Sequence, residues 1–194
     1  MRLTGIFFCR FFPVILFFLS LALMNNAYIL LGSNEGDRMQ HLSNALKRIE
    51  QKAGSILRRS GIYTTAAWGN TDQPDFLNQV ICVTTTLSPQ QLLNTLLDIE
   101  KELGRLRSGT KWMQRIIDLD ILFYNDAVIN TADLTIPHPH LQDRKFVLVP
   151  LCEIASGWIH PVLKKDIAAL TAACKDASDV QILSVIAHVD QDKS

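Results

Sequence analysis

The sequence predicts an α+β domain in which helices pack on one face of an antiparallel sheet. Four apolar segments with strand character are bounded by turn-forming residues, and two segments with apolar residues at helical spacing lie between them. The order is strand, helix, strand, strand, helix, strand. Because no helix joins the two middle strands, we expect them to pair antiparallel. The sheet face opposite the helices is then free for loops and ligands.

Both predicted helices carry start and stop signals. Asp37 is a helix-capping residue, and Gly54 follows the last turn of the first helix. Ser88 and Pro89 are typical of the first turn of the second helix, which Gly104 ends. The apolar stripes between these signals consist of Met39, Leu42, Leu46 and Ile49 in the first helix and Leu92, Leu96, Ile99 and Leu103 in the second.

The predicted strands supply the rest of the domain. They cover residues 27–31, 55–65, 76–87 and 116–124. The third is rich in valine and threonine, which favour extended structure. With the helices between them, the strands give the βαββαβ order of a ferredoxin-like fold. Residues 128–136 add a short hairpin, residues 146–154 are helical in part, and the segment after Cys174 holds a last small element.

The composition argues against several function classes. The 19 basic and 19 acidic residues give a formal net charge of zero, so no overall field attracts nucleic acid or an anionic membrane. The four cysteines show no zinc-ligand spacing, and we expect free thiols in a reducing compartment. Any anion must therefore bind to a local cluster of basic residues.

The first 23 residues differ from the rest of the chain. They are almost wholly apolar from Ile6 onward, which is typical of a signal peptide or a marginal membrane anchor. The charge-free run 11–23 is short for a spanning helix, and Arg10 would be costly in a bilayer. Residues 25–28 lead directly into a strand, so we favour an extension without function, with translation starting at Met24, over a membrane anchor. The predicted division is a hydrophobic extension at 1–23, a folded domain at 24–174 and a C-terminal tail at 175–194.

Asp118 and Asp120 lie two residues apart in the fourth strand and therefore share one face of the sheet. The other, core-facing side carries Ile117, Leu119, Ile121 and Phe123. Two adjacent carboxylates repel unless a cation lies between them, and Mg²⁺ combines one or two carboxylates with substrate phosphates. The pair predicts a magnesium site for phosphoryl transfer. The alternative is a solvated strand face that carries two aspartates.

A basic loop directly precedes these carboxylates. It contains Arg105, Arg107, Lys111 and Arg115 within eleven residues, together with Trp112. Planar guanidinium groups suit phosphate oxygens, so the loop and the carboxylates predict a triphosphate and metal site with a mobile lid. The alternative is a solvated loop whose arginines pair with the two aspartates.

Phe76 and Asn78 share a face of the third strand. The amide offers a donor and an acceptor that match the edge of a pterin ring, and the phenyl ring can stack on it. Phe146, close to Arg144, supplies a second aromatic side. The alternative is that these aromatic residues belong to the core. His138 and His140 could bind a metal, but two histidines alone are weak evidence for a metal site. The alternative is that His138 donates to a phosphate.

Together these residues resemble the 6-hydroxymethyl-7,8-dihydropterin pyrophosphokinase family. The likeness runs from Ala27 to about Ile159. Its most specific parts are Arg115-x-x-Asp118-Leu-Asp120, followed by Pro137-His138, and the segment Gln73-Pro-Asp-Phe-Leu-Asn78. The resemblance implies transfer of pyrophosphate from ATP to the pterin alcohol, giving AMP, in folate biosynthesis. It also implies a ferredoxin-like fold, which agrees with the order of elements.

The resemblance further implies a role for each site residue. The implied catalytic residues are Arg105, Arg115, Asp118 and Asp120, and the two aspartates hold two Mg²⁺ ions. The implied ATP-binding residues are Glu100, Arg107, His138 and Arg144. The implied pterin-binding residues are Thr65, Ala66, Trp68, Phe76, Asn78, Trp112 and Phe146. Two departures from the family pattern are Phe76, in place of a common tyrosine, and Met113-Gln114 beside the lid tryptophan.

These observations predict a cytoplasmic monomer whose partners are ATP and a reduced pterin alcohol, without nucleic acid or membrane. Two other hypotheses stay open. A ferredoxin-like RNA-binding module would use the arginine loop for phosphates, although its paired aspartates would repel them and the stacking motifs of such modules are missing. A membrane-anchored binding protein without activity would have little need for intact Asp118 and Asp120.

Overall fold

The structure is a computed structural model that describes residues 24–66, 74–105 and 115–184. The elements are β1 (Asn25–Ser33), α2 (Arg38–Lys52), β2 (Ser55–Arg59), β3 (Ile62–Thr65), β4 (Phe76–Thr85), α3 (Pro89–Glu102), β5 (Asp118–Tyr124), β6 (Ile129–Asn130), β7 (Thr135–Ile136), a 3-10 turn (Leu141–Asp143), α4 (Lys145–Ala155), α5 (Ile167–Ala173) and β8 (Val180–Ser184). The predicted helices, the hairpin at 128–136 and a helix in 146–154 are all present.

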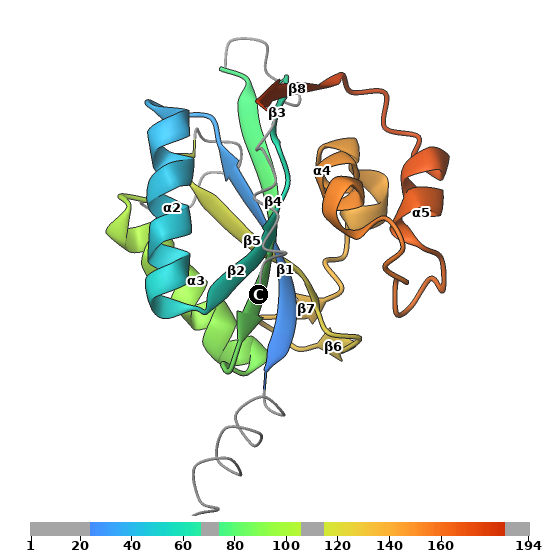
Figure 1. Cartoon of the computed structure of the whole chain (residues 1–194), viewed down its shortest axis with the longest axis horizontal. Helices are drawn as coiled ribbons and strands as arrows, with labels where there is room; N and C mark the ends of the chain where they lie inside the picture. Colours follow the sequence, from blue (N-terminus) through green and yellow to red (C-terminus); the bar gives the residue numbers. More distant parts are fainter. Residues whose placement is uncertain (1–23, 67–73, 106–114, 185–194) are drawn as a thin grey trace, which may run out of the picture.

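One six-stranded antiparallel sheet forms the centre of the domain (Figure 1). Its order is β5-β1-β4-β3-β8, and β2 also pairs with β4. If β2 and β3 are taken as one interrupted strand, the first six elements follow the βαββαβ order, so the predicted fold class is confirmed. The last small element predicted after Cys174 is β8, which extends the same sheet beside β3.

The single strand predicted at 55–65 is wrong, because the chain breaks it between β2 and β3. At the break Ser60 replaces regular pairing with β4. Its backbone N–H donates to the Val80 carbonyl at 2.9 Å, and its Oγ accepts from the Val80 N–H at 3.0 Å. Gln79 Nε2 also donates to the Ser60 carbonyl at 2.8 Å. The serine therefore satisfies the β4 backbone where the strand is interrupted.

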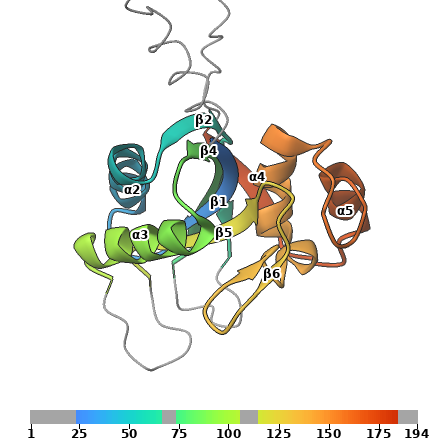
Figure 2. The same ribbon diagram turned by 90° about the horizontal axis from the view of Figure 1, so that it is seen from below.

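Both faces of the sheet are covered by helices, which corrects the expectation of a free second face. Helices α2 and α3 lie on one side, and α4 and α5 lie on the other (Figures 1 and 2). The first layer buries Leu31 of β1 against Ile49 and Ile99. The second buries Leu30 of β1 against Leu151 of α4. Because α4 is almost wholly apolar on its inner side, it needs the sheet as a partner.

A β-bulge in β5 changes which face the end of the strand presents. Tyr28 pairs with Phe123, but the next residue, Ile29, pairs with Ile121, so one residue of β5 is extra. Phe123 consequently packs with Tyr28 under α4, at a ring-centroid distance of 6.3 Å. The prediction that Phe123 shares a side with Leu119 is therefore wrong, although Ile117, Leu119 and Ile121 do share the α2/α3 side.

Both predicted helix starts are confirmed. Asp37 Oδ1 accepts from the Gln40 N–H at 3.0 Å, and Ser88 forms a capping box with Gln91. No helix within 24–66, 74–105 or 115–184 is long and apolar enough to cross a membrane. The extension predicted at 1–23 lies outside the described residues, and the division into extension, domain and tail stays a prediction.

Gly54 is the position at which the fold depends most on a missing side chain. Its φ is +146°, and a Cβ there would lie 2.1 Å from the Thr84 carbonyl oxygen. We expect Gly54→Ala to lower the free energy of unfolding by about 3 kcal/mol or more, because either β4 or the end of α2 must move. Urea denaturation measures this. Gly157→Ala is the control, since a Cβ there meets nothing within 4 Å; equal stability of the two variants would contradict the prediction.

Candidate active site

One row of residues crosses the sheet on the face that α4 covers only in part. Asp118 of β5 pairs with Gly32 of β1, and Gly32 pairs with Asn78 of β4. Thr65 and Phe76 pair with each other in the next row. Directly opposed residues in antiparallel strands point to the same face. The predicted carboxylate and amide therefore lie on one face, with only Gly32 between their strands.

Asn78 and its neighbours form the end of this site predicted to bind a ring. The Asn78 side chain is buried and its Nδ2 donates to Thr65 Oγ1 at 2.9 Å. This bond fixes the amide, so that Oδ1 lies toward Gly32. Phe76 is half-buried at the start of β4, and Phe146 is half-buried in the first turn of α4. The guanidinium of Arg144 lies 5.8 Å from the Phe146 ring centroid, a cation–π contact.

The predicted shared face of Asp118 and Asp120 is confirmed, because Leu119 between them belongs to the core under α2 and α3. Asp118 is not open to solvent on all sides. Its Oδ1 accepts from Arg105 at 2.5 Å, and its Oδ2 pairs with Arg115. The alternative in which loop arginines pair with an aspartate thus holds for Asp118 in the free protein.

Asp120 has no such cation at hydrogen-bonding distance among the described residues. Burial, reinforced by the negative charges of Asp118 and Glu100, raises the pKa of Asp120 to about 7. A nearby divalent cation would stabilise the ionised form of a carboxylate in this environment. Within the described ranges no three metal-ligating side chains converge, so a cation here would complete its shell with water or phosphate, as Mg²⁺ commonly does.

Glu100 lies behind the aspartates and is fully buried at the end of α3. Its Oε1 accepts from the backbone N–H of Leu119 at 2.8 Å and also pairs with Arg105. Because β5 is an edge strand, this carboxylate satisfies the backbone between Asp118 and Asp120. The family resemblance implied a nucleotide contact for Glu100 and did not indicate this role, because the contact joins α3 to β5 in space.

A second set of contacts that the sequence did not predict fixes the residues just before β5. The backbone N–H of Asn34 donates to the Arg115 carbonyl at 3.0 Å, and Asn34 Oδ1 accepts from the Arg115 N–H at 2.7 Å. Ser33 Oγ donates to the Ile116 carbonyl at 2.6 Å. The only signal for these contacts in the sequence is that polar residues follow a buried strand.

Replacing Asn34 tests whether these contacts position Arg115. In Asn34→Ala the Arg115 N–H loses its acceptor, so we expect a loss of about 1 to 3 kcal/mol in stability and roughly a tenfold lower kcat. Asn34→Asp keeps an oxygen acceptor and should recover part of both. Thermal denaturation and steady-state kinetics measure the effects. Unchanged kcat in the alanine variant would show that these contacts are dispensable.

His138 is held as a neutral imidazole. Its Nδ1 accepts from the His140 N–H at 3.3 Å, and its own backbone N–H donates to the Leu122 carbonyl at 3.0 Å. Burial lowers the pKa of His138 to about 4, and the neighbouring charges of Arg144 and His140 act in the same direction. Since Nδ1 is an acceptor, the proton lies on Nε2, which suits donation to a phosphate oxygen.

The His138 pKa gives a pH prediction. In the unfolded chain histidine titrates near 6.5. Between this value and about 4, the unfolded state binds a proton at His138 that the folded state does not. The contribution of His138 to the free energy of unfolding is therefore fully present above about pH 6.5 and is lost as the pH drops toward 4. Two-dimensional NMR of the imidazole nitrogens should show His138 neutral at pH 6. A midpoint near 6.5 would contradict the assignment.

Some predicted residues cannot be placed. Trp68, Arg107, Lys111, Trp112 and the Met113-Gln114 pair lie outside the described residues. Ala66 is exposed directly after β3. The structure therefore joins Asn78 to Thr65 by a hydrogen bond, and Asp118 to Arg105 and Arg115 by ion pairs. The register of β1 with β4 and β5 brings these two groups to either side of Gly32, and the lid stays a prediction.

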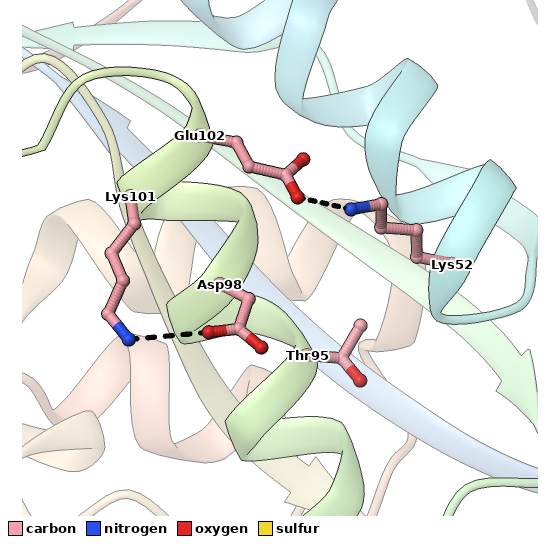
Figure 3. A pocket seen from close by; sticks show the side chains of 5 residues that line it. All are labelled: Lys52, Thr95, Asp98, Lys101 and Glu102. Atoms are coloured by element: carbon pink, nitrogen blue, oxygen red, sulfur yellow. Dashed lines mark hydrogen bonds and ion pairs between the residues drawn. The ribbon is translucent and has the colours of Figure 1, made fainter.

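A separate cavity of about 480 Å³ lies between α2 and α3, on the other side of the sheet. Figure 3 shows its lining, where Lys52 pairs with Glu102 and Lys101 pairs with Asp98 at 3.3 Å. These exposed, mutually neutralised pairs offer neither a carboxylate pair nor a ring-binding surface. The cavity is therefore not the candidate site.

An α+β domain that gathers paired carboxylates, arginines and a ring-binding amide at one end of its sheet is typical of enzymes that transfer phosphoryl groups to a flat heterocycle. The family model for 7,8-dihydro-6-hydroxymethylpterin-pyrophosphokinase matches residues 28–156, which include every candidate site residue. The chain belongs to this family.

Relatives and solved structures agree. The chain is 43% identical over 142 residues to the 2-amino-4-hydroxy-6-hydroxymethyldihydropteridine pyrophosphokinase of Aquifex aeolicus, covering 73% of this chain and 88% of that protein. It is 44% identical over 139 residues to the enzyme of the same name from Haemophilus influenzae, covering 71% and 86%. The wild-type Plasmodium falciparum HPPK-DHPS crystal structure has a TM-score of 0.65 at 19% identity, covering 77% of this chain and 43% of that chain. The latter likeness supports the fold alone.

Proposed function

We propose that the protein transfers pyrophosphate from ATP to the hydroxyl group of 6-hydroxymethyl-7,8-dihydropterin, giving AMP and the pterin diphosphate, as a step of folate biosynthesis. The observation that carries this proposal is the row in which Asp118 and Asn78 lie on either side of Gly32. This register supports a site with a phosphate-and-metal end beside a ring-binding end. The match covers most of the length of the relatives, and their names support the same activity.

The ring-binding end would orient the acceptor. Asn78, fixed by Thr65, would bond the edge of the pterin. Phe76 and Phe146 would stack on its two faces, and Ala66 would line the same pocket. From the resemblance, Trp68 and Trp112 would complete it. Holding the pterin hydroxyl near the β-phosphorus supplies much of the catalysis, since the reaction becomes effectively unimolecular.

The phosphate end would hold the donor. Two Mg²⁺ ions on Asp118 and Asp120 would neutralise charge on the transferred group. Arg105 and Arg115, which pair with Asp118 in the free protein, would turn to phosphate oxygens. The remaining contacts to ATP would come from Glu100, Arg107, His138 and Arg144.

In the transfer itself, the pterin oxygen forms a bond to the β-phosphorus. The bond from that phosphorus to the oxygen bridging the α-phosphate breaks, and AMP leaves with the electron pair. The hydroxyl proton passes to solvent. No side chain forms a covalent intermediate, so the residues act by position and charge. We further propose a cytoplasmic monomer in which residues 1–23 play no part in the reaction.

The direct test is AMP release from ATP by the purified full chain, with and without the pterin alcohol. We expect AMP only when both substrates and Mg²⁺ are present, and loss of product after chelation with EDTA. Mass spectrometry of the second product should show the pterin diphosphate. Release of ADP, or AMP formation independent of the pterin, would contradict the proposal.

A further inference from the structure

We propose that Gly32 is a specificity-determining residue that keeps open the path between the ring-binding end and the phosphate-binding end of the site. The hydroxymethyl arm of the acceptor would cross the sheet above this residue. The inference rests on the proposed function and adds to it a residue that contacts neither phosphate nor metal.

Register places Gly32 midway along this path. It pairs with Asp118 on one side and with Asn78 on the other. Neighbouring strands lie about 4.8 Å apart, so the Asn78 and Asp118 backbones are roughly 10 Å apart across it. A Cβ at Gly32 would lie 3.5 Å from Asn78 Oδ1 and 4.0 Å from the Asp118 Cβ. Any side chain would thus project between the two functional groups.

Backbone geometry does not explain this glycine. Positive φ values occur at Gly36, Gly54 and Gly104 but not at Gly32, which lies within regular β1 pairing. A Cβ would make only ordinary contacts there. Because glycine weakens a strand relative to alanine, stability alone would favour a side chain. The reason for glycine is therefore the space above the strand.

The neighbouring row shows what a side chain does at the equivalent position. Leu30 pairs with Val80 on one side and with Asp120 on the other. The side chains of Leu30 and Val80 are buried in the core under α4. That row is closed to a ligand between its β4 and β5 members. The open row at Gly32 is therefore the first place along β1 where a substrate can bridge the two ends.

The chemistry requires such a bridge. The pterin ring must stay bonded to Asn78 while its hydroxyl oxygen reaches the β-phosphorus held near Asp118. A single carbon separates ring and oxygen, so the arm must lie low over the strand between them. A methyl group at residue 32 would occupy that volume, whereas ATP would still meet Arg105 and Arg115 unhindered.

The test compares Gly32→Ala and Gly32→Val with Gly157→Ala, whose new Cβ meets no atom within 4 Å. We expect Gly32→Ala to melt no lower than the parent, yet to lose about 10-fold to 200-fold in kcat/KM for the pterin. Its Kd for α,β-methylene ATP should stay within about twofold of the parental value, because other residues make the contacts to ATP. Gly32→Val should also lose pterin binding, measured by pterin fluorescence with the ATP analogue bound. Gly157→Ala should match the parent in melting temperature, in kcat/KM and in affinity for both ligands.

The outcomes separate the inference from the proposed function. A parent chain that releases no AMP in the presence of the pterin overturns the proposed function and the inference with it. An active parent whose Gly32→Ala variant keeps the parental kcat/KM and pterin affinity overturns the inference alone. A Gly32→Ala variant that loses affinity for both ligands together with melting temperature would reveal a structural role only, and this also overturns it.

Discussion

Replacing Asp118 or Asp120 by alanine is expected to lower kcat for AMP formation by about a thousandfold or more. The two carboxylates share one face of β5, whereas the nearby Glu100 is buried behind them. A bound cation stabilises charge in the transition state by several kcal/mol, which corresponds to a rate factor of this order. Single-turnover measurement of AMP at saturating ATP, pterin and Mg²⁺ tests it.

Asp120→Asn separates this loss from unfolding. Because the pKa of Asp120 is raised to about 7, the folded state keeps a proton that the unfolded state has lost between about pH 4 and pH 7. The ionised carboxylate therefore destabilises the metal-free protein as pH rises through this range. At pH 8 without Mg²⁺, we expect Asp120→Asn to melt higher than the parent and to be almost inactive. Near-normal turnover in both alanine variants would reject the proposed metal site.

Much of the fold follows from local patterns. Helices α2 and α3 form where apolar residues recur at helical spacing between Asp37 and Gly54 and between Ser88 and Gly104. Alternation along β5 correctly places Asp118 and Asp120 on one face, because a strand has a period of two. These features depend only on neighbours in sequence, which is why sequence suffices for them.

The features that the sequence did not predict depend on contacts between distant segments. The bulge that turns Phe123 toward α4 exists only in the pairing of β5 with β1. The bond from the Leu119 N–H to Glu100 and the bonds between Asn34 and Arg115 join residues 19 and 81 positions apart. The sequence also did not predict that α4 covers the second face of the sheet, because an apolar helix alone does not specify the surface against which it packs.

Arg105→Ala is expected to have the second largest effect, on both stability and catalysis. Arg105 links Glu100, which is 2% exposed, to Asp118, which is 14% exposed. Without it, the buried carboxylate of Glu100 loses this ion pair, and removal of one member of a buried pair costs about 3 to 5 kcal/mol. Loss of an arginine that stabilises a transferred phosphoryl group lowers kcat on the order of a thousandfold.

A matched control lies at the opposite side of the sheet. Lys52 pairs with Glu102 while both side chains stay more than a third exposed, so Lys52→Ala should change the free energy of unfolding by less than about 1 kcal/mol. In the free protein Arg105 also competes with any cation for Asp118. Arg105→Ala should therefore bind Mg²⁺ at least as tightly as the parent in calorimetry without nucleotide, although it turns over ATP far more slowly. Equal stability losses in the arginine and lysine variants, or parental kcat in Arg105→Ala, would contradict the role assigned to this residue.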